Sequence, residues 1–78
     1  MSDEDKVVAA IKKLGVGADV PMSAATRLRD DLGLDSANLI ELTVLVHTMY
    51  GVDLGRRAAE RDTVPNTIGD LVLLMRAS

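Results

Sequence analysis

Residues 30–42, with the sequence DDLGLDSANLIEL, decide the fold of this chain: an acidic loop and a glycine turn lead into an apolar helix. Ser36 lies where the turn meets the helix. Serine is a preferred N-cap residue because its side-chain oxygen can accept a hydrogen bond from a free backbone N–H of the first turn. We therefore expect Ser36 to be the N-cap of a helix that extends to about Tyr50.

The same position offers Ser36 a second role. A hydroxyl group at a helix N-terminus is exposed and can carry a phosphodiester. The free N–H groups and the positive end of the helix dipole would favour the added negative charge. The local sequence leaves both roles open, a structural cap and a site of covalent modification.

The composition indicates one small helical domain that comprises residues 1–78. The chain is 47% hydrophobic, but it has one Tyr and no Phe or Trp, so its core must be aliphatic. Aliphatic residues at helical spacing, without the turn signals of a β-rich chain, are typical of a helical bundle. We predict an all-α fold, a small four-helix bundle with three main helices and a short third helix.

Several classes of function and location are disfavoured. A net charge of −3 argues against a nucleic-acid partner, because phosphate neutralisation needs a basic face. The chain has no cysteine, and His47 is its only histidine, which excludes disulfides, thiolate metal sites and sites with several histidines. No apolar run reaches the length of a membrane span, and the acidic residues 3–5 are unlike a signal peptide. We expect a cytoplasmic protein without metal or membrane partners.

Capping signals and apolar spacing place the helices. The sequence predicts a helix over residues 3–14 with Ser2 as its N-cap, a helix over 36–50, a short helix within 56–61, and a last helix capped by Thr67. The short third helix is expected to turn two residues inward, Leu54 and Ala59.

A long connection over residues 15–35 leads to Ser36. A connection of more than about 15 residues in a compact domain is usually functional or disordered. Its leucines favour order, and we expect Val16, Val20, Leu28 and Leu32 to pin it to the core. Thr26 is expected to cap a short turn that ends at Leu32.

Helix 36–50 has two apolar faces when its residues are placed at 100° steps. The inward face is predicted to hold Leu39, Leu42, Leu45, Val46, Met49 and Tyr50. The opposite face, which we call the outer ridge, holds Ala37, Ile40, Glu41, Val44 and Thr48. Scattered apolar residues are normal on a protein surface, but a stripe that begins one residue after Ser36 favours a surface for docking partners.

The motif Leu32-Gly33-Leu34-Asp35-Ser36, with Glu41-Leu42 after it, resembles the attachment motif of acyl carrier proteins. Leu28 stands upstream at the family's spacing, and Tyr50-Gly51-Val52 ends the long helix where the family usually ends it. Residues 67–71 resemble the family's last helix. Three features depart from the family: Ala37 replaces the usual leucine, His47-Thr48 replace acidic residues of fatty-acid carriers, and residues 55–66 are longer and more basic than usual.

The resemblance implies that Ser36 carries a covalent 4′-phosphopantetheine arm, installed by a phosphopantetheinyl transferase that contacts Asp35. It also implies that the acyl-loading and acyl-processing enzymes dock on the outer ridge. The protein would then be a non-catalytic carrier. A Ser36–His47 catalytic pair also fails on distance, because eleven residues along one helix rise by about 16 Å.

The first hypothesis for function is a discrete, monomeric acyl carrier protein. A chain that starts at Met1 and stops after its last helix resembles a stand-alone carrier. Glu41 is the only charged residue between Ser36 and Tyr50, which disfavours fatty-acid synthase partners and favours polyketide or other natural-product biosynthesis.

Two alternatives stay open: a peptidyl or aminoacyl carrier protein, and an unmodified helical adaptor that binds a partner through the outer ridge. The basic cluster Arg56, Arg57 and Arg61 is either a mixed solvated surface or a docking site.

Overall fold

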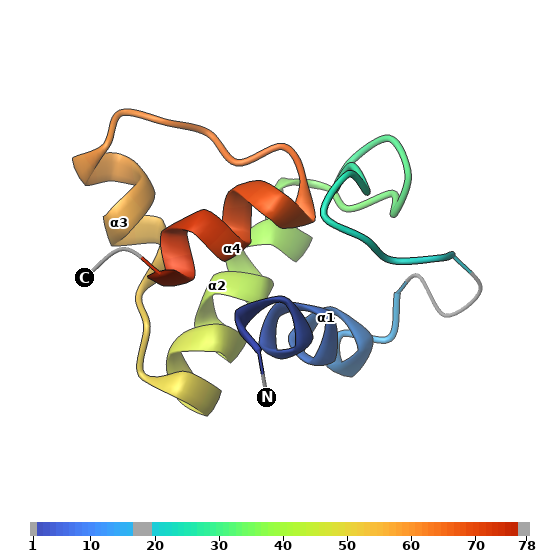
Figure 1. Cartoon of the computed structure of the whole chain (residues 1–78), viewed down its shortest axis with the longest axis horizontal. Helices are drawn as coiled ribbons and strands as arrows, with labels where there is room; N and C mark the ends of the chain where they lie inside the picture. The colour runs from blue at the N-terminus through green and yellow to red at the C-terminus, as the bar shows by residue number, and fades with distance from the viewer. Residues whose placement is uncertain (1, 17–19, 77–78) are drawn as a thin grey trace.

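The computed structural model describes residues 2–16 and 20–76, and this part of the chain forms four helices around one apolar core (Figure 1). The helices are α1 (Asp3–Lys13), α2 (Ser36–Tyr50), α3 (Leu54–Glu60) and α4 (Ile68–Arg76). Helices α2 and α4 each contact both α1 and α3, so the four helices close a ring around the core. The predicted all-α fold, with a short third helix, is confirmed.

Helix α1 begins where the sequence predicts because Ser2 caps it. The Asp5 N–H donates to Ser2 Oγ at 3.1 Å, and the Ser2 N–H donates to Asp5 Oδ2 at 3.4 Å, which completes a capping box. Acidic side chains occupy the first turn and lysines the last, as the helix dipole favours. The helix ends at Lys13, one residue before the predicted end.

The core is aliphatic, and the connection between α1 and α2 contributes to it. The buried hydrophobic residues of the helices are Val7, Ala10, Ile11, Leu42, Val46, Leu54, Ile68, Leu71, Val72, Leu74 and Met75. Leu28, Leu32 and Leu34 of the connection are buried with them. The prediction that Leu28 and Leu32 pin the connection to the core is therefore confirmed.

Backbone hydrogen bonds also attach the connection to the start of α4. They run from the N–H of Leu28 to the carbonyl of Asn66 (2.8 Å), from Ile68 to Thr26 (3.0 Å) and from Gly69 to Ala24 (2.8 Å). A Cβ at position 69 would lie 2.9 Å from the Ala24 carbonyl oxygen. Glycine at position 69 therefore allows the connection to lie directly against α4.

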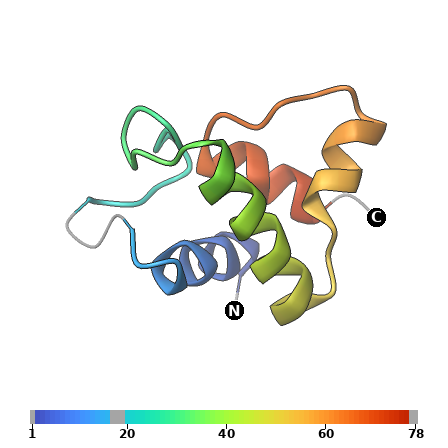
Figure 2. The same cartoon turned by 180° about the vertical axis from the view of Figure 1, so that it is seen from behind.

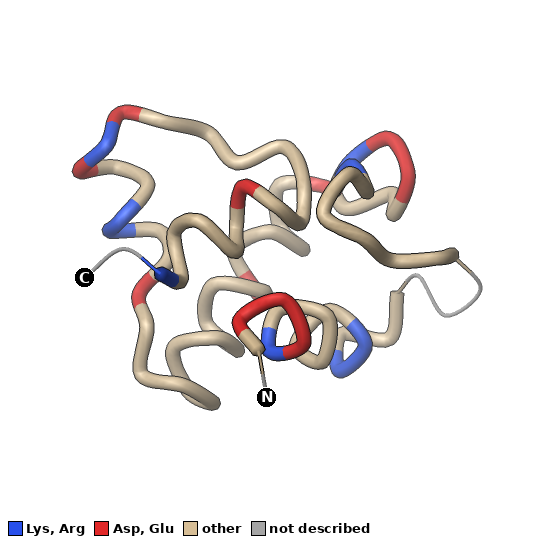
Figure 3. The backbone as a smooth tube through the Cα atoms, viewed as in Figure 1, with Lys and Arg blue, Asp and Glu red and all other residues tan. Residues whose placement is uncertain are grey.

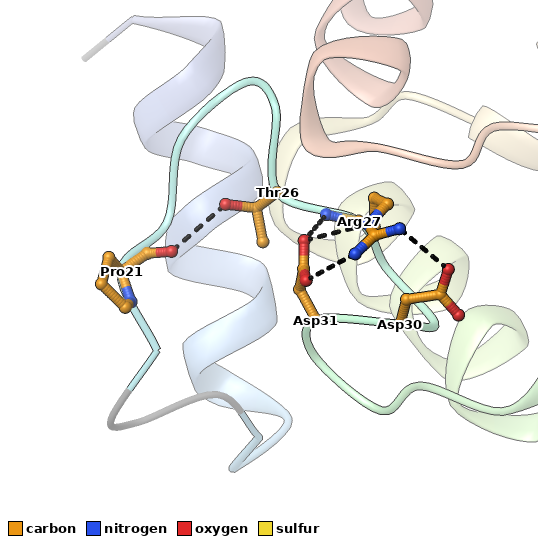
Figure 4. A network of polar contacts seen from close by, with 5 residues as sticks. All are labelled: Pro21, Thr26, Arg27, Asp30 and Asp31. Carbon is orange, nitrogen blue, oxygen red and sulfur yellow. Dashed lines mark hydrogen bonds and ion pairs between the residues drawn. The ribbon is translucent and has the colours of Figure 1, made fainter.

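Thr26 does not cap the turn that ends at Leu32, so that prediction is wrong. The Thr26 side chain is buried and faces back along the chain, and its Oγ1 donates to the carbonyl of Pro21 at 3.2 Å (Figure 4). The same Oγ1 accepts from the N–H of Ser23 at 2.8 Å. Asp31 stabilises the turn instead, because its Oδ2 accepts a 2.7 Å hydrogen bond from the Arg27 N–H.

Helix α3 begins two residues earlier than predicted. Asp53 is its N-cap, and its Oδ1 accepts a hydrogen bond from the Arg56 N–H at 3.0 Å. With this start, Leu54 and Ala58 share the inner face at a spacing of four residues. Ala59 is exposed, so the prediction that it faces inward is wrong.

Candidate functional site

Ser36 lies at the N-terminus of α2, but it is not the N-cap. Asp35 has extended backbone angles, and its Oδ1 accepts a hydrogen bond from the Asn38 N–H at 2.8 Å. The Asp35 N–H in turn donates to Asn38 Oδ1 at 3.2 Å. Aspartate and serine are equally good N-caps, and the reciprocal bond with Asn38 decides in favour of Asp35. Ser36 is therefore the first helical residue, exposed, with a hydroxyl that the cap does not use.

The Ser36 hydroxyl contacts a cation that no local sequence pattern predicted. Nη2 of Arg29 donates to Ser36 Oγ over 3.2 Å. Both side chains are exposed. Arg29 lies in the turn before α2 and Ser36 is the first residue of α2, so the periodicity of one helix or strand does not pair them. The arrangement places a positive charge beside a hydroxyl group at a helix N-terminus.

The turn that precedes α2 brings Arg29 and Ser36 together. The Gly33 N–H donates to the Arg29 carbonyl at 3.0 Å, and the Leu34 N–H donates to the Leu28 carbonyl at 3.0 Å. Gly33 has φ +70°, a left-handed conformation that glycine adopts without strain. Because Leu28 and Leu34 are both buried, the backbone on either side of this turn is fixed to the core.

The acidic residues before Ser36 contact groups other than the Arg29 side chain. Arg27 forms ion pairs with Asp30 and Asp31, each at 3.4 Å (Figure 4). The hydrogen bond from the Arg27 N–H, followed by those from its side chain, lowers the pKa of Asp31 from its usual value. Asp35 is exposed and serves as the cap. None of these three contacts occupies the Arg29 guanidinium.

The outer ridge of α2 faces solvent as predicted. Ala37, Ile40, Glu41, Val44 and Thr48 are all exposed. Ile40 and Val44 keep 65% and 59% of their surface accessible, a large exposure for aliphatic side chains. Seen from behind, α2 crosses in front of α1 and α4 (Figure 2). The prediction for Met49 is wrong: it is exposed, with 36% of its surface accessible, in the last turn of α2.

Two hollows flank the outer ridge. The first, of about 230 Å³, lies between α2 and α3 and is almost wholly apolar, with Leu39, Leu42, Leu54 and Ala58 in its lining. The second, of about 450 Å³, is more open and lies between the end of α1 and α2, with Lys13, Glu41 and Val44 in its lining. Ile40 borders both hollows. Such hollows arise from the packing of separate helices, so the sequence could not place them.

The basic residues of α3 and its end do not form one site. Positively and negatively charged residues follow one another along this segment (Figure 3). Arg56 pairs with Glu60 at 3.9 Å. Arg57 is half-buried and donates from Nη1 to the carbonyls of Leu74 (2.8 Å) and Met75 (3.0 Å) at the end of α4. Arg57 therefore has a structural role, which the sequence did not predict, while Arg56 and Arg61 are exposed.

Two further findings concern metals and membranes. Among residues 2–16 and 20–76, no three His, Cys, Asp or Glu side chains are placed to hold a metal ion. In the same part of the chain, no helix has the length and apolar character that crossing a membrane requires. His47 is exposed in the last turn of α2.

A comparison with protein-family models gives a match that covers most of the chain. The family model described as "Phosphopantetheine attachment site" matches residues 5–72. This span runs from the first turn of α1 into α4 and includes Ser36, Arg29 and the outer ridge. No solved structure matches the chain.

Proposed function

Because the chain belongs to the phosphopantetheine attachment family, we propose that it is an acyl carrier protein that holds acyl groups as thioesters on an arm attached to Ser36. Members of this family carry a covalently attached 4′-phosphopantetheine. A carrier of this kind needs one accessible hydroxyl for the arm. It also needs a thiol, which must come from the arm because the chain has no cysteine.

The observation that carries the proposal is the exposed Ser36 hydroxyl with Arg29 Nη2 at 3.2 Å. The hydroxyl is on the first turn of α2, outside the Asp35–Asn38 cap, so its modification disrupts no hydrogen bond of the cap. A guanidinium at this distance suits a phosphodiester, because arginine recognises phosphate oxygens through charge and hydrogen bonds together. These residues therefore fit the group that the family carries.

The protein itself supplies attachment and presentation, with no catalytic step. A phosphopantetheinyl transferase would install the arm, with Asp35 at the rim of its contact surface. The loaded thioester would then reach enzymes that dock on Ala37, Ile40, Glu41, Val44 and Thr48. Tethering raises the effective concentration of the acyl group at each of these enzymes. We expect the carrier to be a cytoplasmic monomer.

The lining of the hollow and the charge of the outer ridge indicate the cargo and the pathway. The apolar hollow between α2 and α3 favours an acyl group over a charged cargo, because its lining offers almost no polar partner. The near absence of charge on the outer ridge favours polyketide or other natural-product biosynthesis over fatty-acid synthesis. Peptidyl or aminoacyl carriage is the second candidate, and Asp35 before the serine favours the acyl type.

Intact-mass spectrometry tests the proposal directly. The chain is coexpressed with a promiscuous phosphopantetheinyl transferase, beside a Ser36→Ala variant. The wild type should gain the mass of one phosphopantetheine, and the variant should gain none. Wild-type protein that remains unmodified would favour the third candidate, an adaptor without a prosthetic group. If the wild type is loaded, the mass of protein purified from its native host would identify the cargo.

A further inference from the structure

We propose that Arg29 binds the phosphodiester at the root of the arm and so positions the arm on the domain. This inference rests on the proposed attachment at Ser36. The guanidinium already donates to Ser36 Oγ at 3.2 Å, the atom that becomes the ester oxygen. The phosphate oxygens are bonded to the same phosphorus as this ester oxygen, so they lie close to the guanidinium. Arginine is a planar donor fork that can bind two such oxygens at once.

The charge balance at the start of α2 explains why a cation is needed there. A helix N-terminus ordinarily favours an anion. Here the Asp35 carboxylate already accepts the Asn38 N–H and holds a negative charge at this end of the helix. A phosphodiester on Ser36 adds a second negative charge beside it. Arg29 offsets that repulsion, whereas Arg27 is paired with Asp30 and Asp31.

The backbone holds Arg29 in place before any arm is attached. The Arg29 carbonyl accepts the Gly33 N–H at 3.0 Å, and the neighbouring Leu28 is buried with 1% of its surface accessible. Only the side chain of Arg29 has to order when it binds a phosphate. The contact is exposed, so salt should weaken it: the Debye length falls from about 8 Å at 0.15 M to about 3 Å at 1 M ionic strength.

The test compares four arm-bearing proteins: wild type, Arg29→Gln, Arg29→Lys and Arg56→Gln. Arg56→Gln removes the same charge from an exposed arginine of α3 and is the matched control. Loading is driven to completion and checked by intact mass. The readouts are the ³¹P NMR signal of the phosphodiester and the ¹H–¹⁵N signals of the arginine side chains, at low and high salt.

Four results are expected. Loading shifts the Arg29 guanidinium signal in the wild type. Arg29→Gln moves the ³¹P signal towards that of free phosphopantetheine and narrows it, while Arg56→Gln matches the wild type. The ³¹P signal of Arg29→Lys lies between those of wild type and Arg29→Gln, because an ammonium keeps the charge but lacks the paired, planar donors of a guanidinium. High salt moves the wild-type signal towards that of Arg29→Gln, and the populations change by at most about fivefold, as for an exposed ion pair.

Two results would overturn the inference. Identical ³¹P signals for wild type and Arg29→Gln at low salt would show that Arg29 does not touch the arm. An Arg29 guanidinium signal unchanged by loading would do the same. If Arg29→Gln accepts no arm, the ³¹P signals of wild type and Arg29→Lys at low and high salt decide whether Arg29 contacts the phosphodiester. Wild type that takes no arm overturns the proposed function as well, which intact mass distinguishes from failure of the Arg29 contact alone.

Discussion

Asp35 accepts a 2.8 Å hydrogen bond through Oδ1 from the backbone N–H of Asn38, and this bond caps α2. Ser36 lies between these two residues in sequence, and its side chain takes no part in the cap. Asp35 caps the helix and the neighbouring Ser36 offers the hydroxyl, so two different residues have these two roles. Substitutions at the two positions should therefore differ in their effect on stability.

Ser36→Ala should abolish loading and leave stability within about 0.5 kcal/mol of the wild type, as for other exposed positions. Asp35→Ala should cost about 1 kcal/mol, because the first turn of α2 loses its cap. Urea denaturation measures the stabilities, and intact mass measures loading. A Ser36→Ala protein that still acquires phosphopantetheine would disprove attachment at this serine.

Leu42→Ala should destabilise the domain by roughly 2–5 kcal/mol. Leu42 has 1% of its surface accessible at the centre of the helix ring, and its truncation leaves a cavity. For a small domain this is a large part of the total stability. Val44→Ala is the control on the same helix, since Val44 is 59% accessible. Equal urea midpoints for the two variants would contradict the orientation of α2.

Arg57→Gln should cost about 1 kcal/mol, whereas Arg56→Gln should cost almost nothing. Both changes remove one positive charge from α3. Arg57 donates to two carbonyls at the end of α4, and hydrogen bonds from charged donors contribute more than those from neutral ones. Arg56 has only an exposed ion pair at 3.9 Å. Thermal unfolding compares the two, and equal losses would mean that the bonds to α4 contribute nothing.

Stability should depend on the charge of Asp31 in acid. Its pKa is lowered in the folded state, first by the Arg27 N–H and then by the Arg27 side chain. A lowered folded pKa contributes stability above the unfolded value of about 3.9, and this contribution is lost as pH falls further.

The melting temperatures of wild type and Asp31→Asn should therefore differ at neutral pH and converge below about pH 4. Asp30→Asn is the control, because Asp30 contacts the same arginine without accepting its backbone N–H. A gap between wild type and Asp31→Asn that stays constant from neutral pH into acid would contradict the assignment.

Val44→Glu should leave the melting temperature nearly unchanged and slow acyl transfer to the native downstream enzyme. The side chain is exposed on the outer ridge, where an apolar contact would set residence time. Glu41→Ala should alter the association rate, because a charge at the rim of an interface steers encounters. The measurement is acyl transfer by fully loaded wild type and both variants. Equal rates for all three would remove the outer ridge as the docking surface.

The sequence predicted the elements whose signals are local. Capping residues and helical spacing located α1, α2 and α4, and the outer ridge followed from the same spacing. Local signals failed where two residues compete for one role. Asp35 and Ser36 are both good caps, and only the bond with Asn38 distinguishes them.

The features that the sequence did not predict depend on contacts between segments that are distant in the chain, and the pattern of a single helix does not specify such contacts. Arg29 reaches Ser36 only because the turn at Gly33 folds back. Arg57 finds the end of α4 only after α3 and α4 have packed. The hollow between α2 and α3 likewise exists only in the assembled ring.

The hydrogen bonds between the connection and the start of α4 have a consequence for the order of folding. They join residues about forty positions apart, and contacts between such distant residues form slowly because a long loop must close first. The turn that presents Ser36 lies within this closed loop. A nascent chain that does not yet contain residues 66–69 lacks the bonds that attach the connection to α4. A transferase that requires this attachment would therefore act only after those residues have been synthesised.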